Sequence, residues 1–276
     1  MKVGVVGVGN MGRHYAKKMK LMGFQTTLID INQTTLNKFD DYYKKYPSYD
    51  EALEKEEFDF IFIATSPELH IPLAKKAIEK KINVMVEKPP AINPLELEEA
   101  IIMAQKNNVY LGVSEIELQS NAVRNFDKNL HVEQVEAYRL NLGRGYINPF
   151  YDLAWHDLYI MQYLFGSVKL KKVIDKGNIF EVFGETEKNE FFLKVAWNYE
   201  KLRREWILKS TKGNIVLDFV NDKIIYPDKT TKEKDGKDKL ETMIKNFIDN
   251  PSFESAYRAL EILKEFEKFN IKEKVS

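Results

Sequence analysis

The chain contains no cysteine, and this absence removes several kinds of chemistry. Without thiols it can form no disulfide, no metal–thiolate site and no cysteine nucleophile. Only 4 histidines occur among the 276 residues, and their scattered positions lack the spacing typical of metal ligands. We therefore expect no metal site.

A net charge is also absent, because 42 basic and 42 acidic side chains cancel. A balanced surface provides no electrostatic attraction for nucleic acid or for an anionic membrane. No apolar run approaches the roughly 18 residues of a transmembrane helix, and the apolar N-terminus lacks a signal-peptide cleavage site. We expect a cytoplasmic protein with a small polar ligand and with neither nucleic acid nor a membrane as a partner.

The first half of the chain alternates short apolar strands with helices. We predict strands at residues 2–8, 24–30, 59–65, 83–87 and 109–114, and helices at 13–22, 71–81 and 95–108. Strands that are apolar on both faces and separated by helices are typical of a parallel sheet covered on both sides. This half is therefore predicted to be an α/β domain.

A glycine-rich turn, GVGNMG, joins the first predicted strand directly to the first helix. In this context Gly7 permits a tight turn, Gly9 lets the backbone approach a pyrophosphate, and Gly12 lets helix and strand pack closely. The N–H groups at the start of the helix would then face the phosphates. The predicted dinucleotide contacts in this turn are Gly7, Gly9, Asn10, Met11 and Gly12.

Asp30 ends the second predicted strand, about 18 residues past Gly12. A carboxylate at this place accepts hydrogen bonds from the ribose hydroxyls of the adenosine and repels the 2′-phosphate of NADP. The sequence therefore predicts a Rossmann domain that favours NAD over NADP. The alternative is a purely structural glycine turn followed by a chance aspartate.

Two further segments, ATSPELH at 64–70 and EKPP at 87–90, begin where predicted strands finish. Ligands of open parallel sheets bind beyond the carboxyl ends of the strands, so both segments should face the cofactor.

These segments resemble the family of glucose-fructose oxidoreductase, inositol dehydrogenase and MocA-type proteins, which are NAD(P)-dependent enzymes of sugars, nucleotide sugars and cyclitols. The resemblance is carried by GVGNMG, by DFIFIATSPELHIPLAKKAIEKKINVMVEKPPA at 59–91 and by DLAWHDLYIMQYLFG at 152–166. It implies that Lys88 donates a hydrogen bond to the reacting oxygen and that the peptide bond before Pro89 is cis. It also implies that His70 is not catalytic. The residues expected to contact the cofactor are Thr65, Ser66, His70, Glu87, Lys88 and Glu115.

The same resemblance implies catalytic roles for Asp152 and His156, whose four-residue spacing places them on one face of a predicted helix. His156 would be the general acid/base, since imidazole titrates near neutrality. Asp152 would accept a hydrogen bond from a substrate hydroxyl and hold the sugar ring.

Three departures from the family pattern limit this transfer. The glycine between the two catalytic positions is Ala154, and the later aspartate is Tyr159. Asp157 points about 100° away from His156 around the helix and is a poor substitute. In GVSEIELQSN, at 112–121, Glu115 matches the family's glutamate, but the arginine and the proline of the family pattern are missing, so substrate specificity does not carry over.

The second half alternates apolar and polar residues, the pattern of antiparallel strands with one covered face. Strands are expected within 131–143, 169–185, 189–200, 203–219 and 222–227, and helices at 241–250 and 254–269. We therefore predict a Rossmann domain over residues 1–118 and an α+β domain with a largely antiparallel open sheet over 119–276.

Several aromatic and polar residues of the second half suggest further contacts. Trp197, Tyr199, Trp206 and Ile207 would form an apolar patch on the sheet that supports a homodimer or homotetramer, although packing against the domain's own helices is an alternative. Arg144, Tyr146 and Asn148 would contact the periphery of the substrate.

The combined interpretation is an NAD-dependent oxidoreductase. It would transfer a hydride between nicotinamide and a secondary alcohol carbon of a sugar, nucleotide sugar or cyclitol. The alternative is a non-catalytic dinucleotide-binding sensor or regulatory protein on the same fold, because a fold alone does not determine function.

Overall fold

A computed structural model describes residues 1–145, 147–233, 235–269 and 271. By its internal contacts the chain divides into two units. The first comprises Met1–Ser114 with Leu240–Leu260, and the second comprises Glu115–Lys239 with Glu261–Ser276.

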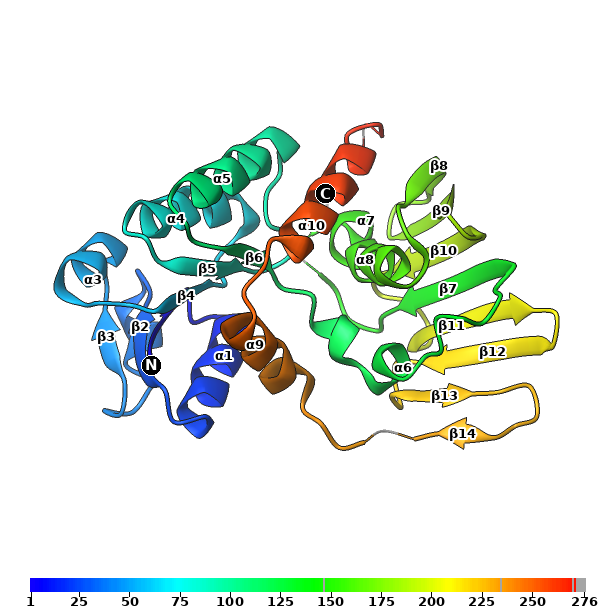
Figure 1. The fold of residues 1–276 in the computed structure, drawn as a ribbon, viewed down its shortest axis with the longest axis horizontal. Helices are drawn as coiled ribbons and strands as arrows, with labels where there is room; N and C mark the ends of the chain where they lie inside the picture. The colour runs from blue at the N-terminus through cyan, green and yellow to red at the C-terminus, as the bar shows by residue number, and fades with distance from the viewer. Residues whose placement is uncertain (146, 234, 270, 272–276) are drawn as a thin grey trace. The chain divides into compact units, whose positions relative to one another are not determined.

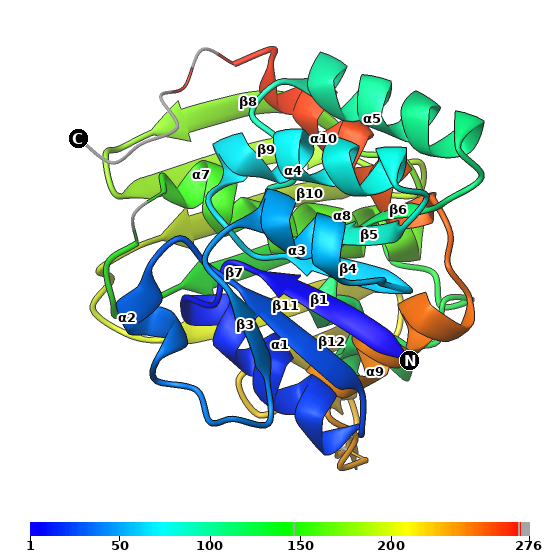
Figure 2. The same cartoon turned by 90° about the vertical axis from the view of Figure 1, so that its left-hand side faces the viewer.

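The first unit is built on a six-stranded sheet whose strands are all parallel (Figure 1). The strands are β1 (Lys2–Val6), β2 (Gln25–Ile29), β3 (Lys44–Tyr46), β4 (Phe60–Ile63), β5 (Asn83–Val86) and β6 (Leu111–Val113). Their order is β3-β2-β1-β4-β5-β6, with β3 at one edge (Figure 2). The order reverses at β1 and β4, where Rossmann sheets bind dinucleotides.

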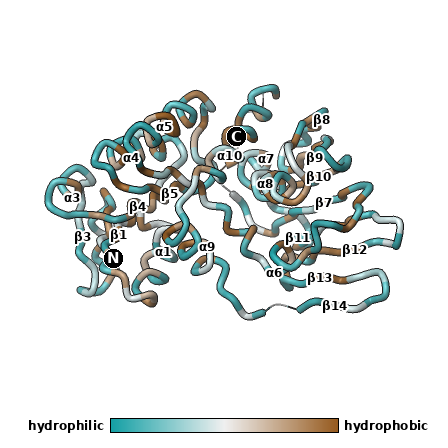
Figure 3. Tube along the Cα trace, viewed as in Figure 1, coloured by the Kyte–Doolittle hydropathy of each residue, from teal (hydrophilic) through white to brown (hydrophobic). Residues whose placement is uncertain are grey.

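Helices cover both faces of this sheet, with α4 and α5 on one side and α1 and α9 on the other (Figure 1). The helices of the unit are α1 (Asn10–Leu21), α2 (Gln33–Leu36), α3 (Tyr49–Lys55), α4 (Pro67–Glu79), α5 (Pro94–Lys106), nearly all of α9 (Lys239–Asp249) and the first half of α10 (Glu254–Phe266). Burial on both faces explains why β4 and β5 are apolar throughout most of their length, as Figure 3 shows.

The position of α9 corrects the predicted domain limits. Residues 240–260 belong to the first unit, whereas the sequence division at residue 118 assigned them to the second. The ring of Phe247 packs 5.8 Å from that of Phe60 and 6.2 Å from that of Phe62. A side chain at Gly112 would lie only 2.6 Å from this ring, so β6 and α9 are closely packed.

The second unit contains an eight-stranded sheet in the order β14-β13-β12-β11-β7-β10-β9-β8. The strands are β7 (Gln134–Leu140), β8 (Lys169–Asp175), β9 (Ile179–Glu185), β10 (Glu190–Ala196), β11 (Arg203–Ser210), β12 (Gly213–Asp218), β13 (Lys223–Ile225) and β14 (Thr231–Lys232). Neighbouring strands are antiparallel except β7 and β10, which are parallel. The predicted fold class, a Rossmann domain followed by an α+β domain on a largely antiparallel sheet, is confirmed.

Four short helical segments accompany this sheet: η1 (Ile116–Gln119), α6 (Asn121–Arg124), α7 (Pro149–Asp152) and α8 (Ala154–Phe165). Helix α8 is buried along nearly its whole length. Trp206 of β11 is fully buried and its Nε1 donates to Asp157 of α8 at 2.8 Å. Trp206 therefore lies on the covered face, and its predicted place in an exposed patch is wrong.

Candidate functional site

The glycine turn after β1 has the geometry that dinucleotide binding requires. Gly7 has φ +80°, and a Cβ there would lie 2.8 Å from the carbonyl oxygen of Ala64. A Cβ on Gly12 would lie 1.8 Å from the carbonyl oxygen of Gly7, so only glycine allows helix and turn to pack this closely. A Cβ on Gly9 would meet nothing within 4 Å, which leaves the backbone of the turn approachable.

Helix α1 begins at Asn10, directly after this turn, with Gly9 at its N-cap. Within the described part of the chain, no side chain caps the helix at this end. The N–H groups of a first helical turn have no partner inside the helix, and together with the helix dipole they favour an anion. A pyrophosphate fits this end of α1.

Asp30 lies beside the turn, at the end of β2. Its Oδ2 accepts the N–H of Val8 at 2.9 Å and its Oδ1 accepts the N–H of Asn32 at 2.8 Å. Each carboxylate oxygen retains a further lone pair that can accept a ribose hydroxyl. The turn, the helix start and this carboxylate therefore suit a dinucleotide.

His70, in α4, connects two turns at the carboxyl edge of the sheet. Its Nδ1 is 3.0 Å from the carbonyl oxygen of Pro89, and its Nε2 is 3.0 Å from that of Thr65. The side chain is 1% exposed, and burial lowers its pKa. Because both ring nitrogens contact backbone carbonyls, His70 fixes the turns after β4 and β5. Its direct contact with a cofactor stays a prediction.

Glu87, the residue after β5, is held by a network inside the first unit. The hydroxyl of Tyr15 donates to Oε1 of Glu87 at 2.6 Å, and the N–H of Lys88 contacts Oε2 at 3.2 Å. The Tyr15 hydroxyl also lies 3.3 Å from Oγ of Ser114. The peptide bond between Lys88 and Pro89 is cis, as expected from the resemblance.

Tyr15 and Ser114 were not identified from the sequence. Tyr15 is 1% exposed, and burial together with the carboxylate of Glu87 raises its pKa well above the usual value. It therefore stays protonated and available as a donor. The only sequence signal is its place on the inward face of α1, which apolar residues share.

Substitution of Tyr15 by phenylalanine should lower the free energy of unfolding by about 1.5 to 3 kcal/mol, because a buried carboxylate loses a hydrogen-bond donor. Chemical denaturation measures this change. Tyr43→Phe is the matched control, since it removes a hydroxyl whose acceptor among the described residues is the neutral carbonyl of Ala16, at 3.2 Å. An equal loss of unfolding free energy in both variants would show that the hydrogen bond to Glu87 stabilises the protein no more than a bond to a neutral carbonyl.

The second unit holds the other predicted catalytic residues, Asp152 and His156, which are both half-buried. The prediction that one helix carries both residues is wrong, because α7 ends at Asp152 and α8 begins at Ala154. At the break, the N–H of His156 donates to the carbonyl oxygen of Leu153 at 3.2 Å. This acceptor is three residues earlier in the chain, whereas in an α-helix it would be four residues earlier.

Nδ1 of His156 lies 3.0 Å from the hydroxyl of Tyr159. The two rings are 5.7 Å apart and nearly perpendicular. Tyr159, which occupies the place of the family's aspartate, therefore contacts the predicted acid/base directly.

Asp157, the neighbour of His156, has a structural role. It is fully buried, and its carboxylate accepts Nε of Arg139 at 2.7 Å and Nη2 at 3.2 Å, in addition to Trp206. Burial by itself would lower the pKa of Arg139, but the charges of Asp157 and Glu117 raise it above its usual value. The guanidinium is therefore always charged, and Asp157 balances it.

Three further residues were predicted to contact the cofactor or the substrate, and they differ in exposure. Glu115 is 6% exposed and precedes η1. Asn148 caps α7 by accepting the N–H of Phe150 at 2.8 Å, and Arg144 is exposed. Tyr146 lies outside the described residues.

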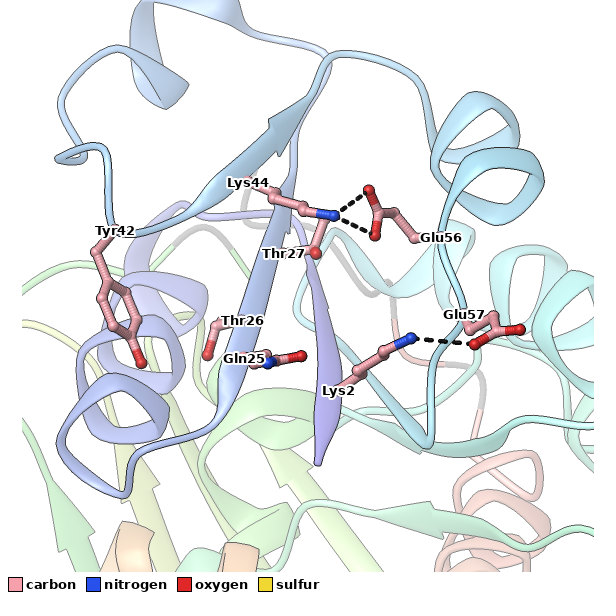
Figure 4. Close-up of a pocket in the computed structure, with 8 residues that line it drawn as sticks. All are labelled: Lys2, Gln25, Thr26, Thr27, Tyr42, Lys44, Glu56 and Glu57. Atoms are coloured by element: carbon pink, nitrogen blue, oxygen red, sulfur yellow. Dashed lines mark hydrogen bonds and ion pairs between the residues drawn. The ribbon is translucent and has the colours of Figure 1, made fainter.

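A surface hollow lies at the opposite, amino ends of β1, β2 and β3 (Figure 4). Its charged residues form ion pairs, Lys2 with Glu57 at 3.0 Å and Lys44 with Glu56 at 2.8 Å. Because this end of the sheet is remote from the glycine turn, we do not assign the hollow to the dinucleotide.

Within the described ranges, no group of three or more His, Cys, Asp or Glu side chains is placed to hold a metal ion. The helices that are described there lack the length and apolar character needed to cross a membrane.

Comparison with known proteins agrees with this geometry. A model of the Gfo/Idh/MocA oxidoreductase family, with an NAD-binding Rossmann fold, matches residues 1–115. Oxidoreductase P35 of Formosa agariphila is 24% identical over 256 residues, which cover 78% of each chain. UDP-N-acetylglucosamine 3-dehydrogenase of Acidithiobacillus ferrooxidans is 27% identical over 126 residues, 45% of this chain and 40% of the relative.

The solved structure of that UDP-N-acetylglucosamine 3-dehydrogenase, GnnA, superposes with a TM-score of 0.85 over 97% of this chain and 96% of its own, at 22% identity. The WlbA dehydrogenase of Chromobacterium violaceum, in complex with NADH and UDP-GlcNAcA, has a TM-score of 0.78 and 14% identity over 95% of this chain and 90% of its own. At these identities the likeness shows a shared fold.

The first unit is therefore an NAD-binding Rossmann domain of an oxidoreductase. Residues 1–115, which are less than half of the chain, match the NAD-binding domain of the Gfo/Idh/MocA oxidoreductase family, and the chain as a whole is similar to oxidoreductases of this fold.

Proposed function

We propose that this protein is an NAD-dependent dehydrogenase that transfers a hydride between nicotinamide and a secondary alcohol carbon of a sugar, nucleotide sugar or cyclitol. The observation that supports it most is the approachable backbone at Gly9, with the uncapped start of α1 and Asp30 beside it. A nucleotide sugar is the first candidate, because a UDP-N-acetylglucosamine dehydrogenase is among the relatives.

When bound, the nicotinamide accepts or supplies the hydride, and the protein residues handle the oxygen and its proton. Lys88 donates a hydrogen bond to the reacting oxygen and stabilises the charge that develops on it. As the carbon loses its hydride, His156 takes the hydroxyl proton, and in the reverse direction it returns a proton. Asp152 accepts a hydrogen bond from a second substrate hydroxyl.

A panel of UDP-sugars, free sugars and inositols, incubated with the protein and NAD, tests this function through the absorbance of reduced nicotinamide. Turnover of at least one member is expected. NAD binding without turnover of any member would instead favour a dinucleotide-binding sensor on the same fold.

The cofactor preference depends on Asp30. Asp30→Asn keeps the size of the side chain but removes its charge, so the preference for NADH over NADPH should fall by about tenfold or more, equivalent to about 1.4 kcal/mol. Fluorescence titration of both dinucleotides measures this ratio. If the wild-type protein prefers NADPH, the role given to Asp30 is wrong.

The proposal includes a homodimer or homotetramer associated through the face of the second sheet opposite α8. Aromatic rings lie there, with Phe192 5.2 Å from Phe183 and 6.0 Å from Tyr138. Light scattering of the purified protein measures its mass in solution. We also propose a cytoplasmic location, where the dinucleotide pool is.

A further inference from the structure

Tyr159 lies in α8, three residues after His156, and is fully buried. Among the described residues its hydroxyl has two hydrogen-bond partners, one on each side. One is Nδ1 of His156 at 3.0 Å, and the other is the backbone N–H of Glu117 at 3.0 Å. The hydroxyl therefore bridges α8 and η1.

The N–H of Glu117 is in the first turn of η1, which no described side chain caps at its N-cap residue, Glu115. Such an N–H has no partner within its helix and must find one elsewhere. The Tyr159 oxygen provides that acceptor. This bond fixes the position of the hydroxyl independently of any ligand.

These two partners determine where the hydroxyl proton of Tyr159 points. A backbone N–H can only donate, so the Tyr159 oxygen accepts from Glu117. The single phenol proton is left for the imidazole, and Nδ1 must then be the acceptor, because a buried hydroxyl proton without a partner costs about 1 to 3 kcal/mol. Burial and the charge of Glu117 raise the pKa of Tyr159 well above its usual value, so the proton is retained.

Charged groups surround this hydroxyl, but among the described residues its hydrogen-bond partners are the imidazole of His156 and the backbone of Glu117, and neither is a carboxylate. Glu117 is paired with Lys239 at 3.1 Å, and Arg139 is paired with Asp157. These side chains come from η1, β7 and α8 and from the first residue of α9. Tyr159 therefore contacts His156 as a neutral phenol, at the position where the family pattern has a carboxylate.

We propose that Tyr159 is a positioning residue that holds neutral His156 as the tautomer with its proton on Nε2. A carboxylate can only accept, so it would select the opposite tautomer, with the proton on Nδ1. Resting His156 thus presents an N–H at Nε2 instead of a lone pair. In the proposed function, on which this role depends, that N–H donates to the reacting oxygen, and a proton is accepted at Nε2 only after the ring changes tautomer.

Nuclear magnetic resonance of protein labelled with ¹⁵N-histidine tests this assignment without cofactor or substrate. The chain has only 4 histidines, and the signals missing from His156→Gln identify the ring. Above the pH at which the ring loses its charge, the wild-type His156 should show a protonated Nε2 and an unprotonated, hydrogen-bonded Nδ1. A protonated Nδ1 in the neutral wild-type ring would overturn the proposal, with no variant needed.

Tyr159→Phe keeps the aromatic ring and removes only the hydroxyl. The fraction of neutral His156 with a proton on Nδ1 should rise in this variant, while Tyr43→Phe, which also removes one buried hydroxyl, should leave the His156 signals unchanged. Identical His156 signals in Tyr159→Phe and the wild type would also overturn the proposal.

The result is separable from the fate of the proposed function. If Nε2 carries the proton and no substrate is turned over, the dehydrogenase assignment fails, and Tyr159 still sets the tautomer of His156 but has no role in that reaction. If a substrate is turned over and Nδ1 carries the proton, the dehydrogenase assignment stands and the role of Tyr159 fails.

Discussion

Replacement of His156 by alanine is expected to slow turnover by about 10² to 10⁴-fold and to leave NAD affinity unchanged. The expected fall is large because the variant has no group to exchange the substrate proton. NAD affinity should persist because the glycine turn, α1 and Asp30 all belong to the first unit, whereas His156 belongs to the second. Steady-state kinetics and dinucleotide titration measure the two quantities separately.

His131→Ala is the matched control, since His131 is exposed in a loop before β7 and has no assigned role. Its turnover should equal that of the wild-type protein. Unchanged turnover in His156→Ala would remove the acid/base role of His156, and a loss of dinucleotide affinity there would show that the variant is damaged more widely.

Replacement of Asp157 by alanine is expected to lower the free energy of unfolding by about 3 to 5 kcal/mol. The variant leaves the buried guanidinium of Arg139 without a counter-charge and removes the acceptor of the Trp206 indole N–H. Both partners are nearly inaccessible to water, which cannot replace the lost bonds. Chemical denaturation of the two proteins at the same pH measures the difference.

Glu99→Ala provides the comparison with an exposed ion pair. Glu99 binds Lys75 at 2.8 Å, but its side chain is 68% exposed, so its removal should change stability by less than about 1 kcal/mol. If Asp157→Ala lowered the free energy of unfolding as little as Glu99→Ala, the buried pair of Arg139 and Asp157 would not anchor α8 to the sheet.

The elements with the strongest local patterns could be predicted from the sequence. The apolar run of β4 matches a strand buried on both faces, and the turn from Gly7 to Gly12 matches a strand that leads directly into a helix. These signals depend only on neighbouring residues. They were sufficient for the fold class and for the predicted dinucleotide-binding turn.

Features that depend on distant residues could not be predicted in this way. The return of α9 to the first sheet is decided by the packing of Phe247 on β4 and β6. The partner of Glu87 is Tyr15, 72 residues earlier in the chain. The inward direction of Trp206 depends on Asp157, and alternation along β11 alone does not show which face is covered.

The central claim is that the turn at Gly9 binds NAD, and calorimetric titration of NADH into Gly9→Val tests it most directly. Gly143→Val is the control, because a Cβ at either glycine meets nothing within 4 Å and should leave folding intact. We expect NADH affinity to fall by about a hundredfold or more, about 2.7 kcal/mol, in Gly9→Val and to stay unchanged in Gly143→Val. Wild-type affinity in a folded Gly9→Val protein would contradict the proposed binding site.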